Sequence, residues 1–245
     1  MKKHLTILSA ILITLFSLTA KAQDDKPQAK SYLAFLGGIS TPTGSFASTS
    51  YSNNSSGFAK TSVTLALDGA VYVYKNLAIG ATFSFQDQGE LTQADDQNLA
   101  NGYNNSFIKN QTSVTSVNRY HNLNLMGGPQ YTFLYKNFAL DIRADAGVIK
   151  SASTPSTIII FDYSSNSGQT YNQLSSGALA FAYGGSAGLR YTLSDAWDVG
   201  LRVNYVTSNG IKISNTGGDA GTVGRFQTNL PISEVQTTIG FTLKF

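Results

Sequence analysis

The most constraining feature of the chain is its last twelve residues, which alternate apolar and polar side chains and end on an aromatic residue. Successive side chains of a β-strand point to opposite faces, so the segment 234–245 has one apolar face and one polar face. The apolar face carries Val235, Ile239, Phe241 and Leu243, and it ends at Phe245. In lipid every backbone group needs a partner within the protein, and an open strand edge provides none. The pattern therefore predicts a strand of a closed barrel.

The composition of the rest of the chain agrees with a barrel and excludes several other classes of protein. After residue 23 no apolar stretch approaches the length of a spanning helix, whereas 13 Tyr and 14 Phe are spread along the chain. Transmembrane strands look like this because only about half of their side chains face lipid. The chain has no cysteine, which excludes a disulfide framework and a thiolate metal site.

The first 22 residues have the pattern of a secretory signal peptide. Lys2-Lys3 precedes an apolar run over 5–18, and Ala20-Lys21-Ala22 follows it. The run is shorter than the roughly 20 residues of a spanning helix, so we expect cleavage after Ala22. This predicts a signal peptide over 1–22, a periplasmic lead-in over 23–30 and a barrel domain over 31–245.

The basic excess of the chain lies in this signal peptide. Removing Lys2, Lys3 and Lys21 lowers the count of Lys and Arg from 17 to 14, which equals the 14 Asp and Glu residues. The mature chain is therefore near neutral, and it contains no run of basic residues. The sequence predicts no nucleic-acid partner.

Eight segments with strand character follow, joined by connections of unequal length. The short connections are the tight turns within 74–78, 135–139 and 193–197. The long connections are rich in Ser, Asn, Thr, Gly and Gln, and cover 41–59, 89–116, 151–176 and 209–232. Transmembrane barrels have short turns on the periplasmic side and longer loops outside. The predicted strands are 31–40, 60–74, 77–88, 117–134, 138–150, 177–193, 197–208 and 233–245.

The sequence thus predicts an all-β fold: an eight-stranded antiparallel up-and-down transmembrane barrel with both chain ends in the periplasm. The apolar stretch 157–163 leaves alternatives open. The first alternative is that it extends two strands above the membrane, and the second is that it adds a hairpin and makes a ten-stranded barrel. The third is that it packs as a loop over the barrel mouth. An exposed strand edge there would allow a partner to bind by strand addition.

Charged residues in the predicted strands share the face opposite to the apolar residues. An ion directed at the bilayer centre costs about 2 to 4 kcal/mol, so we expect these side chains to point into the lumen. The lumen of an eight-stranded barrel is only wide enough to be filled by side chains, which predicts mutual pairing and a plugged interior; a narrow solute channel is the alternative. The predicted interior charge network comprises Asp68, Asp141, Arg143, Asp145, Arg190, Asp198, Arg202, Glu234 and Lys244.

Aromatic residues take two kinds of position in this pattern. Tyr72 and Tyr74 fall on the inward face, which predicts a bulge or an early end of the lipid zone in that strand. Aromatic side chains near the short turns are expected to lie at the membrane interface, with the ring in acyl chains and the polar tip among headgroups. This predicted girdle comprises Tyr135, Phe138, Tyr191, Trp197 and Phe245.

Together, the Ala-x-Ala signal, the eight alternating segments with Lys-Asn turns, the segment 37–46 and the terminal Phe245 resemble the small outer-membrane β-barrel family of Gram-negative bacteria. This "porin family" includes OmpX and the transmembrane domain of OmpA. The resemblance implies location in the outer membrane, contact with lipid and lipopolysaccharide, and transient recognition by the barrel-assembly machinery. The assembly signal that the resemblance implies consists of Ile239, Phe241, Leu243 and Phe245.

Members of this family are structural proteins, adhesins, surface-recognition proteins or small channels, so the resemblance does not fix an activity. We predict a monomeric, non-enzymatic barrel whose loops have structural or surface-interaction roles, with an unidentified extracellular ligand. The alternatives are a narrow porin-like channel for small solutes and a lipid-modifying or proteolytic enzyme.

The sequence predicts no catalytic, cofactor-binding or metal site. After removal of the signal peptide, His121 is the one remaining histidine, with Arg119 nearby and Asp95-Asp96 as the acids expected to approach it. Catalysis by a histidine base needs an imidazole that faces substrate and an orienting carboxylate at hydrogen-bond distance. The alternative is that Arg119 and His121 lie among lipid headgroups or lipopolysaccharide phosphates.

Overall fold

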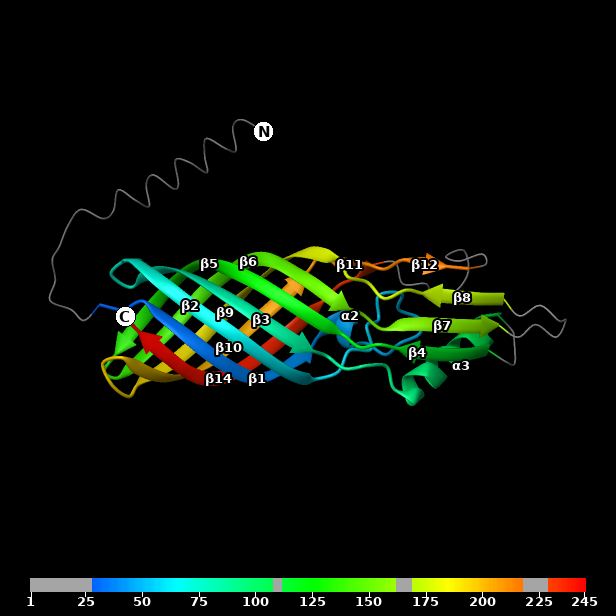
Figure 1. Ribbon diagram of the computed structural model, residues 1–245, viewed down its shortest axis with the longest axis horizontal. Helices are drawn as coiled ribbons and strands as arrows, with labels where there is room; N and C mark the ends of the chain where they lie inside the picture. The colour runs from blue at the N-terminus through cyan, green and yellow to red at the C-terminus, as the bar shows by residue number, and fades with distance from the viewer. Residues whose placement is uncertain (1–27, 108–111, 162–168, 218–228) are drawn as a thin grey trace, which may run out of the picture.

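Eight antiparallel strands form a closed barrel in the computed structural model, which describes residues 28–107, 112–161, 169–217 and 229–245 (Figure 1). The order around the barrel is β1-β14-β10-β9-β6-β5-β3-β2, so each strand pairs with the next barrel strand in the chain and β14 closes onto β1. The predicted eight-stranded up-and-down barrel is confirmed. The strands are β1 (Tyr32–Pro42), β2 (Ser62–Tyr74), β3 (Leu77–Asp87), β5 (His121–Tyr135), β6 (Phe138–Ser153), β9 (Leu179–Thr192), β10 (Trp197–Ser208) and β14 (Ser233–Lys244).

The two ends of the barrel differ, because all short connections lie at one of them. At this turn end, Lys75 and Lys136 adopt left-handed backbone conformations, with φ of 44° and 53°, in the two-residue turns β2–β3 and β5–β6. The bulge predicted near Tyr72 is present as a register shift between Tyr72 and Tyr74. The other end, from which the long connections leave, is the loop end.

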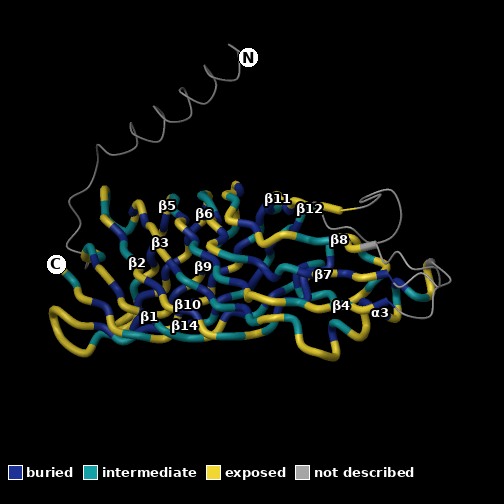
Figure 2. The backbone as a smooth tube through the Cα atoms, turned by 45° about the vertical axis from the view of Figure 1, so that its right-hand side comes forward, coloured by how far each residue is buried: buried dark blue, intermediate teal, exposed yellow. Residues whose placement is uncertain are grey.

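Burial alternates along every barrel strand (Figure 2). In β6, for example, Leu140 and Ile142 are exposed whereas Asp141 and Arg143 are buried. A closed barrel in which the apolar side chains face outward and the charged ones inward is the arrangement that a lipid environment favours. The exposed outer residues include Phe35, Leu65, Ile79, Phe83, Leu125, Phe133, Leu189, Leu201, Ile239 and Phe241.

Inward-facing glycines allow neighbouring strands of this narrow barrel to approach closely. A Cβ atom on Gly128 would lie 1.9 Å from the carbonyl oxygen of Ala144, and one on Gly184 would lie 1.9 Å from that of Tyr205. No other residue fits such a position without moving the backbone. The curvature of the wall therefore depends on residues that lack a side chain.

The long connections fold into an ordered extension beyond the loop end of the barrel (Figure 1). Its four-stranded sheet has the order β12-β8-β7-β4, formed by Asn215–Thr216, Gln169–Gln173, Ser156–Phe161 and Thr112–Val117, and helix α3 (Gln93–Phe107) lies beside β4. The ten-stranded alternative is wrong, because β7 and β8 pair within this sheet instead of joining the barrel. The shorter elements are α2 (Gly44–Ala47), β11 (Ile211–Lys212) and β13 (Asn229–Leu230).

The extension has a hydrophobic cluster of its own, which the polar composition of the loops concealed. Residues distant in sequence meet there: Phe58, Leu99, Tyr103, Ile159, Phe161 and Tyr171 are buried together. Of the apolar stretch 157–163, the part up to residue 161 belongs to β7 and supplies Ile159 and Phe161 to this cluster, while residues 162 and 163 lie outside the described residues.

A second hydrophobic cluster closes the loop end of the barrel beneath the extension. Barrel residues Met126, Ile149 and Val206 pack there with loop residues such as Phe46 and Ile232. The polar lumen is thus covered by an apolar layer. Among the described residues, no helix combines the length and the apolar character needed to cross a membrane.

Candidate functional site

The barrel lumen holds the largest concentration of charged side chains in the described part of the chain. Eight of the nine predicted interior ions form one connected chain in which acids and bases alternate, here called the ion ladder. Its contacts, in order, are Asp145–Arg143 (2.8 Å), Arg143–Asp68 (2.8 Å), Asp68–Arg202 (2.9 Å), Arg202–Asp141 (3.7 Å), Asp141–Arg190 (2.8 Å), Arg190–Asp198 (3.0 Å) and Asp198–Lys244 (2.6 Å).

The ion ladder is electrically neutral, since its four acids match its four bases. Its two terminal contacts, at Asp145 and Lys244, are short enough for ion pairing but lack hydrogen-bond alignment at the carboxylate oxygen. The inner contacts are hydrogen-bonded: Arg190 Nε and Nη2 donate to the two oxygens of Asp141. Bidentate pairing of this kind is the strong form of the arginine–carboxylate interaction.

Two tyrosines carry the network across the lumen. Arg190 of β9 donates through Nη2 to the hydroxyl of Tyr72 on β2 at 3.3 Å, and β9 and β2 lie on opposite sides of the barrel. The hydroxyl of Tyr32 donates to Asp68 at 3.0 Å and accepts from Arg202 at 2.8 Å, while the Arg190 guanidinium carbon lies 4.1 Å from the centroid of the Tyr32 ring. These contacts join opposite walls and fill the space between them.

Tyr32, Thr82, Gln130 and Thr132 belong to this interior layer, although the charge pattern of the sequence did not identify them. Thr82 donates to Asp68 at 2.5 Å and Thr132 donates to Asp141 at 2.6 Å. The alternation that identified the charged residues also contained this signal, because these side chains alternate with outward apolar residues such as Leu33, Phe83, Tyr131 and Phe133. Uncharged polar residues are compatible with either face near a strand end, so their parity alone is a weaker signal than charge.

Glycines make room for the arginines of the ion ladder. A Cβ on Gly188 would lie 3.2 Å from Arg202 Nη2, and a Cβ on Gly200 would lie 3.1 Å from Arg190 Cγ. On Gly80, a Cβ would lie 2.9 Å from Arg143 Cδ. The lumen is therefore filled by long side chains that lie against bare backbone.

Glu234, the ninth predicted interior ion, lies apart from the ladder in a second polar layer nearer the loop end. It is fully buried, and no Lys, Arg or His of the described residues lies within ion-pairing distance of it. Ser40 Oγ donates to it at 2.8 Å, Asn124 Nδ2 at 2.7 Å and Gln236 Nε2 at 2.7 Å, and Gln88 Nε2 donates as well. The predicted mutual pairing of the interior ions is thus wrong for Glu234, which is held by neutral donors.

His121 lies on the outer surface near the loop end, where its ring stacks on Phe85 with the centroids 5.8 Å apart. The acid beside it is Asp87, whose Oδ2 lies 3.8 Å from His121 Nε2. The expectation that Asp95 or Asp96 approaches His121 is wrong: Asp95 pairs with Lys60, and Asp96 accepts from the backbone N–H of Ser116.

Ser153 completes a superficial likeness to a catalytic triad around His121. Its Oγ lies 3.2 Å from His121 Nδ1, but this hydroxyl donates to the carbonyl oxygen of Arg119 at 2.7 Å. Asp87 is engaged by Arg119, which contacts both of its oxygens at 3.0 Å. A triad requires the hydroxyl proton to face the imidazole and the carboxylate to bind the opposite ring nitrogen. In this geometry Asp87 pairs with Arg119, and the Ser153 hydroxyl caps the carbonyl oxygen of Arg119.

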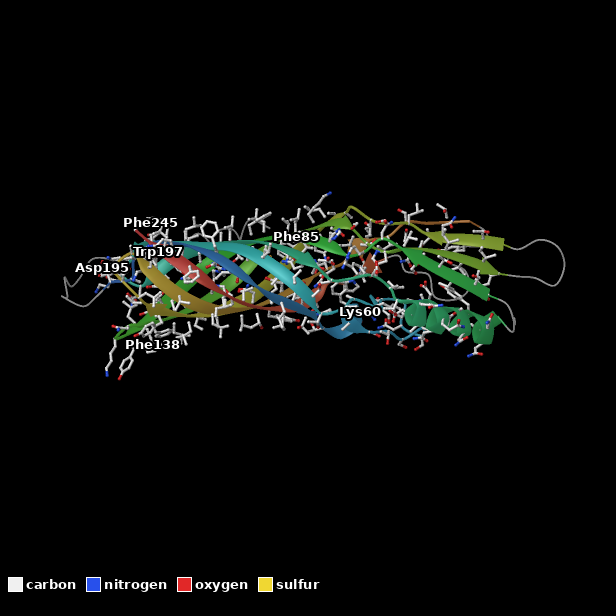
Figure 3. All side chains as sticks on the ribbon, turned by 60° about the horizontal axis from the view of Figure 1, so that its bottom comes forward. Lys60, Phe85, Phe138, Asp195, Trp197 and Phe245 are labelled. Carbon is white, nitrogen blue, oxygen red and sulfur yellow. The ribbon has the colours of Figure 1, made fainter. Side chains whose placement is uncertain are left out.

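The predicted girdle residues gather at the turn end, where Phe138, Trp197 and Phe245 lie close to one another along the axis (Figure 3). Tyr135 and Phe245 are the most exposed members, at 69% and 72%. The rings of Phe138 and Tyr191 contact each other with centroids 5.0 Å apart. The predicted assembly-signal residues Ile239, Phe241, Leu243 and Phe245 all lie exposed on the outer face at β14.

The extension presents an open groove of about 760 Å³ between α3 and β4. β4 is an edge strand, and two of its backbone N–H groups are bound by α3: Thr112 donates to Asn104 Oδ1 at 2.9 Å, and Ser116 donates to Asp96 Oδ2 at 3.0 Å. Backbone N–H groups of a strand point alternately to its two sides, so the N–H of Val114, between Thr112 and Ser116, also points toward the groove. Glu90 and Asp96 are the charged residues that line it.

A capping box begins α3 and ties it to the barrel rim. Thr92 Oγ1 accepts from the backbone N–H of Asp95, and Asp95 Oδ2 accepts from the backbone N–H of Thr92 at 2.8 Å. Lys60, at the junction of barrel and extension in Figure 3, lies 2.9 Å from the same carboxylate. Burial raises the pKa of Asp95, but the hydrogen bonds from Thr92 and the contact with Lys60 outweigh burial and hold that pKa below its usual value.

Replacing Tyr103 by alanine is expected to loosen the extension and leave the barrel folded. Tyr103 is 1% exposed, and its ring contacts Tyr51 at 5.0 Å and Phe161 at 5.5 Å between centroids. Loss of a buried aromatic side chain costs about 3 to 5 kcal/mol. Limited proteolysis should cleave the variant within the extension while the barrel remains protected. Cleavage within the barrel, or no change in cleavage, would contradict the separation of the two cores.

The described residues contain no group of three or more His, Asp or Glu side chains able to hold a metal ion. The polar layers of the lumen instead offer neutral oxygen atoms and paired ions.

Comparison with known proteins finds similarity of structure alone: no family model and no curated protein sequence matches the chain. Neisserial surface protein A has a TM-score of 0.45 at 9% identity, with 90% of this chain and 100% of that chain covered. A major outer membrane protein from Thermus thermophilus has a TM-score of 0.45 at 14% identity, with 89% and 100% covered. The attachment invasion locus protein Ail of Yersinia pestis has a TM-score of 0.39 at 9% identity, with 89% and 100% covered.

Proposed function

We propose that the chain is an integral outer-membrane protein that does not conduct solutes and that uses its barrel to present the folded extension at the cell surface. The observation that carries this proposal is the filled lumen: ions and tyrosines join opposite walls of the barrel, and an apolar layer closes its loop end. A wall of exposed apolar side chains around a polar interior supports insertion in lipid. The unequal lengths of the connections support an orientation with the extension outside.

The extension supports a role in surface interaction, because it has its own core and an accessible groove. In the groove between α3 and β4, α3 binds the N–H groups of Thr112 and Ser116, so an extended peptide would pair with the edge strand at Val114 and contact the groove through its side chains. Its lining carries Glu90 and Asp96 and no basic residue, so a ligand with Lys or Arg would complement it. The extracellular ligand of the proposed function is thus a basic, extended segment of another protein.

The remaining contacts of the proposed function follow from the outer wall. Lipid acyl chains cover the apolar belt, and the exposed aromatic residues at the turn end lie among headgroups. Arg119 at the opposite rim faces the level of lipopolysaccharide phosphates. The barrel-assembly machinery would recognise β14 together with Phe245, which follows it. The barrel acts as a monomer.

The arrangement around His121 favours a non-enzymatic role over the hydrolase alternative. The hydroxyl of Ser153 donates to a backbone carbonyl, and Asp87 is engaged by Arg119. An activated nucleophile needs that hydroxyl directed at the imidazole.

The purified protein is expected to show no stable single-channel steps in planar lipid bilayers. The reason is that Arg190, Tyr72 and their partners occupy the cross-section of the lumen. The measurement is current against voltage for the wild type and for Arg143→Ala, which removes part of the plug. Stable steps in the wild type whose conductance changes in Arg143→Ala would replace the proposed function by the channel alternative.

A further inference from the structure

Two of the short turns place a lysine in a strained backbone conformation. Lys75 and Lys136 have φ of 44° and 53°, in the left-handed region that residues with a Cβ atom disfavour and that glycine or asparagine usually occupies. Each turn contains an asparagine, but it is the next residue, Asn76 or Asn137, and it does not adopt this conformation. Backbone geometry alone therefore does not account for the lysines. A costly conformation that is kept in both turns points to a function of the side chain.

The side chains of the two lysines are held in the same way. Lys75 Nζ lies 5.6 Å from the centroid of the Tyr74 ring, and Lys136 Nζ lies 5.5 Å from the centroid of the Tyr135 ring. Both distances are within the range of a cation–π interaction. Neither ammonium group has an acidic partner or a hydrogen-bond acceptor among the described residues. Each turn thus presents a positioned cation whose hydrogen-bond donors are unused.

Three basic side chains near the loop end are engaged within the protein instead. Lys60 and Arg119 contact the acids Asp95 and Asp87, and Lys150 Nζ donates to a backbone carbonyl oxygen. The turn lysines differ from these residues because their ammonium groups remain available to a ligand.

The two turns are neighbours at the turn end. β3 follows one turn and pairs with β5, which precedes the other, and the Thr132 N–H donates to the carbonyl oxygen of Asn76 at 3.0 Å. The exposed acidic groups of the turn end are Asp195 and the C-terminal carboxylate of Phe245, among the residues that the structure describes. Both lie apart from Phe138, which follows the β5–β6 turn (Figure 3). Positive charge is therefore concentrated on one side of the turn end.

The position of the ammonium groups identifies the ligand. Aromatic rings at the end of a membrane barrel lie at the boundary between acyl chains and headgroups, and lysines directly beyond them extend their charge to the phosphates. An ammonium group has three donors and binds phosphate as a point charge. The headgroup of a zwitterionic lipid carries a cation of its own, which competes for this phosphate. An anionic headgroup such as phosphatidylglycerol has no such competitor.

We propose that the β2–β3 and β5–β6 turns form a binding surface for anionic phospholipid in the periplasmic leaflet, with Lys75 and Lys136 bound to lipid phosphates. This inference rests on the proposed insertion in the outer membrane. It adds a preference for one class of lipid, and it assigns that preference to one side of the barrel.

The test compares urea unfolding of the full chain from vesicles of phosphatidylcholine with unfolding from vesicles that also contain phosphatidylglycerol, at matched ionic strength. The lipid preference is the ratio of the two unfolding equilibrium constants. A lysine near an anionic surface contributes about 5-fold, so Lys75→Gln and Lys136→Gln should each lower the preference by about that factor and the double variant by about 25-fold. Lys212→Gln is the matched control: it removes an exposed lysine of the extension and should keep the full preference.

The double variant Lys75→Gly/Lys136→Gly separates lipid binding from a structural role of the lysines. Glycine adopts the left-handed conformation without steric cost, so this variant should be at least as stable as the wild type in phosphatidylcholine and should lose the preference. Lower stability in phosphatidylcholine would assign the lysines to the turns themselves and overturn the proposal.

Two further results would overturn the lipid site. One is an equal preference in the wild type and both double variants, which would leave the proposed membrane location intact. The other is equal stabilisation of the wild type in phosphatidylcholine by inorganic phosphate, which would make free phosphate the ligand. Failure of the wild type to insert in either kind of vesicle would instead overturn the proposed function together with this inference.

Discussion

Replacing Asp68 by leucine is expected to lower the free energy of unfolding of the barrel by about 3 to 5 kcal/mol, which is the cost of breaking a buried ion pair from one side. Asp68 is 1% exposed and lies between two arginines, with Arg143 Nη2 at 2.8 Å and Arg202 Nη2 at 2.9 Å. Its removal leaves two guanidinium groups in a closed lumen with fewer acceptors. Thr82 loses its acceptor at the same time, and the Tyr32 hydroxyl keeps only Gln130 Oε1 at 3.3 Å.

The measurement is urea-induced unfolding of the refolded protein, followed by electrophoretic mobility. Asp145→Leu is the matched control, because Asp145 also faces the lumen but contacts one arginine at the end of the ion ladder. The control should lose clearly less stability than Asp68→Leu. Equal losses for the two variants would show that each interior ion contributes to stability independently, and that the connections of the ion ladder add nothing to the free energy of unfolding.

Leu201→Arg is expected to destabilise the inserted barrel by about 2 to 4 kcal/mol, the cost of an arginine on the lipid face near the bilayer midplane. Leu201 is 47% exposed on the outer wall, whereas the adjacent Arg202 is 4% exposed in the lumen. One step along β10 therefore separates a position that requires an apolar side chain from one that contains an arginine.

Unfolding from lipid vesicles measures this difference. Leu193→Arg is the matched control, because Leu193 is also an exposed leucine but lies in the turn between β9 and β10, where the cost falls to about 0 to 1 kcal/mol. Similar losses for both variants would mean that the wall around Leu201 does not face hydrocarbon.

The barrel was predictable from the sequence because its determinants are local. A strand repeats every two residues, so Asp141, Arg143 and Asp145 identify their face without knowledge of any partner. The predicted boundaries differ from β2, β3, β9 and β10 by two residues or fewer. The predicted strand 117–134 begins four residues before β5. The other differences of two residues or more, at the ends of β1 and β6 and the starts of β2 and β9, lie where long connections begin or end.

The extension was not predicted, because its core depends on contacts between distant segments. Phe58 and Tyr103 are isolated apolar residues in polar loops, and they meet Ile159 of the apolar stretch 157–163 only in the folded extension. One local signal was available: Thr92 and Asp95 have the spacing of a capping box, which marks the start of α3. The lack of a basic partner for Glu234 was not predictable either. Alternation along a strand shows which face a residue lies on, but not whether a Lys or Arg of another strand lies at the same level of the barrel axis.

The alternation of charge in the ion ladder has a consequence for the order of insertion. Asp68 of β2 is neutralised by residues of β6 and β10, and Asp198 of β10 is neutralised in part by Lys244 at the end of the last strand. No isolated hairpin contains a complete set of partners, so a partly assembled sheet would carry bare ions into hydrocarbon. With the membrane location proposed above, we expect the strands to come together before they leave water, which would make membrane entry all-or-none.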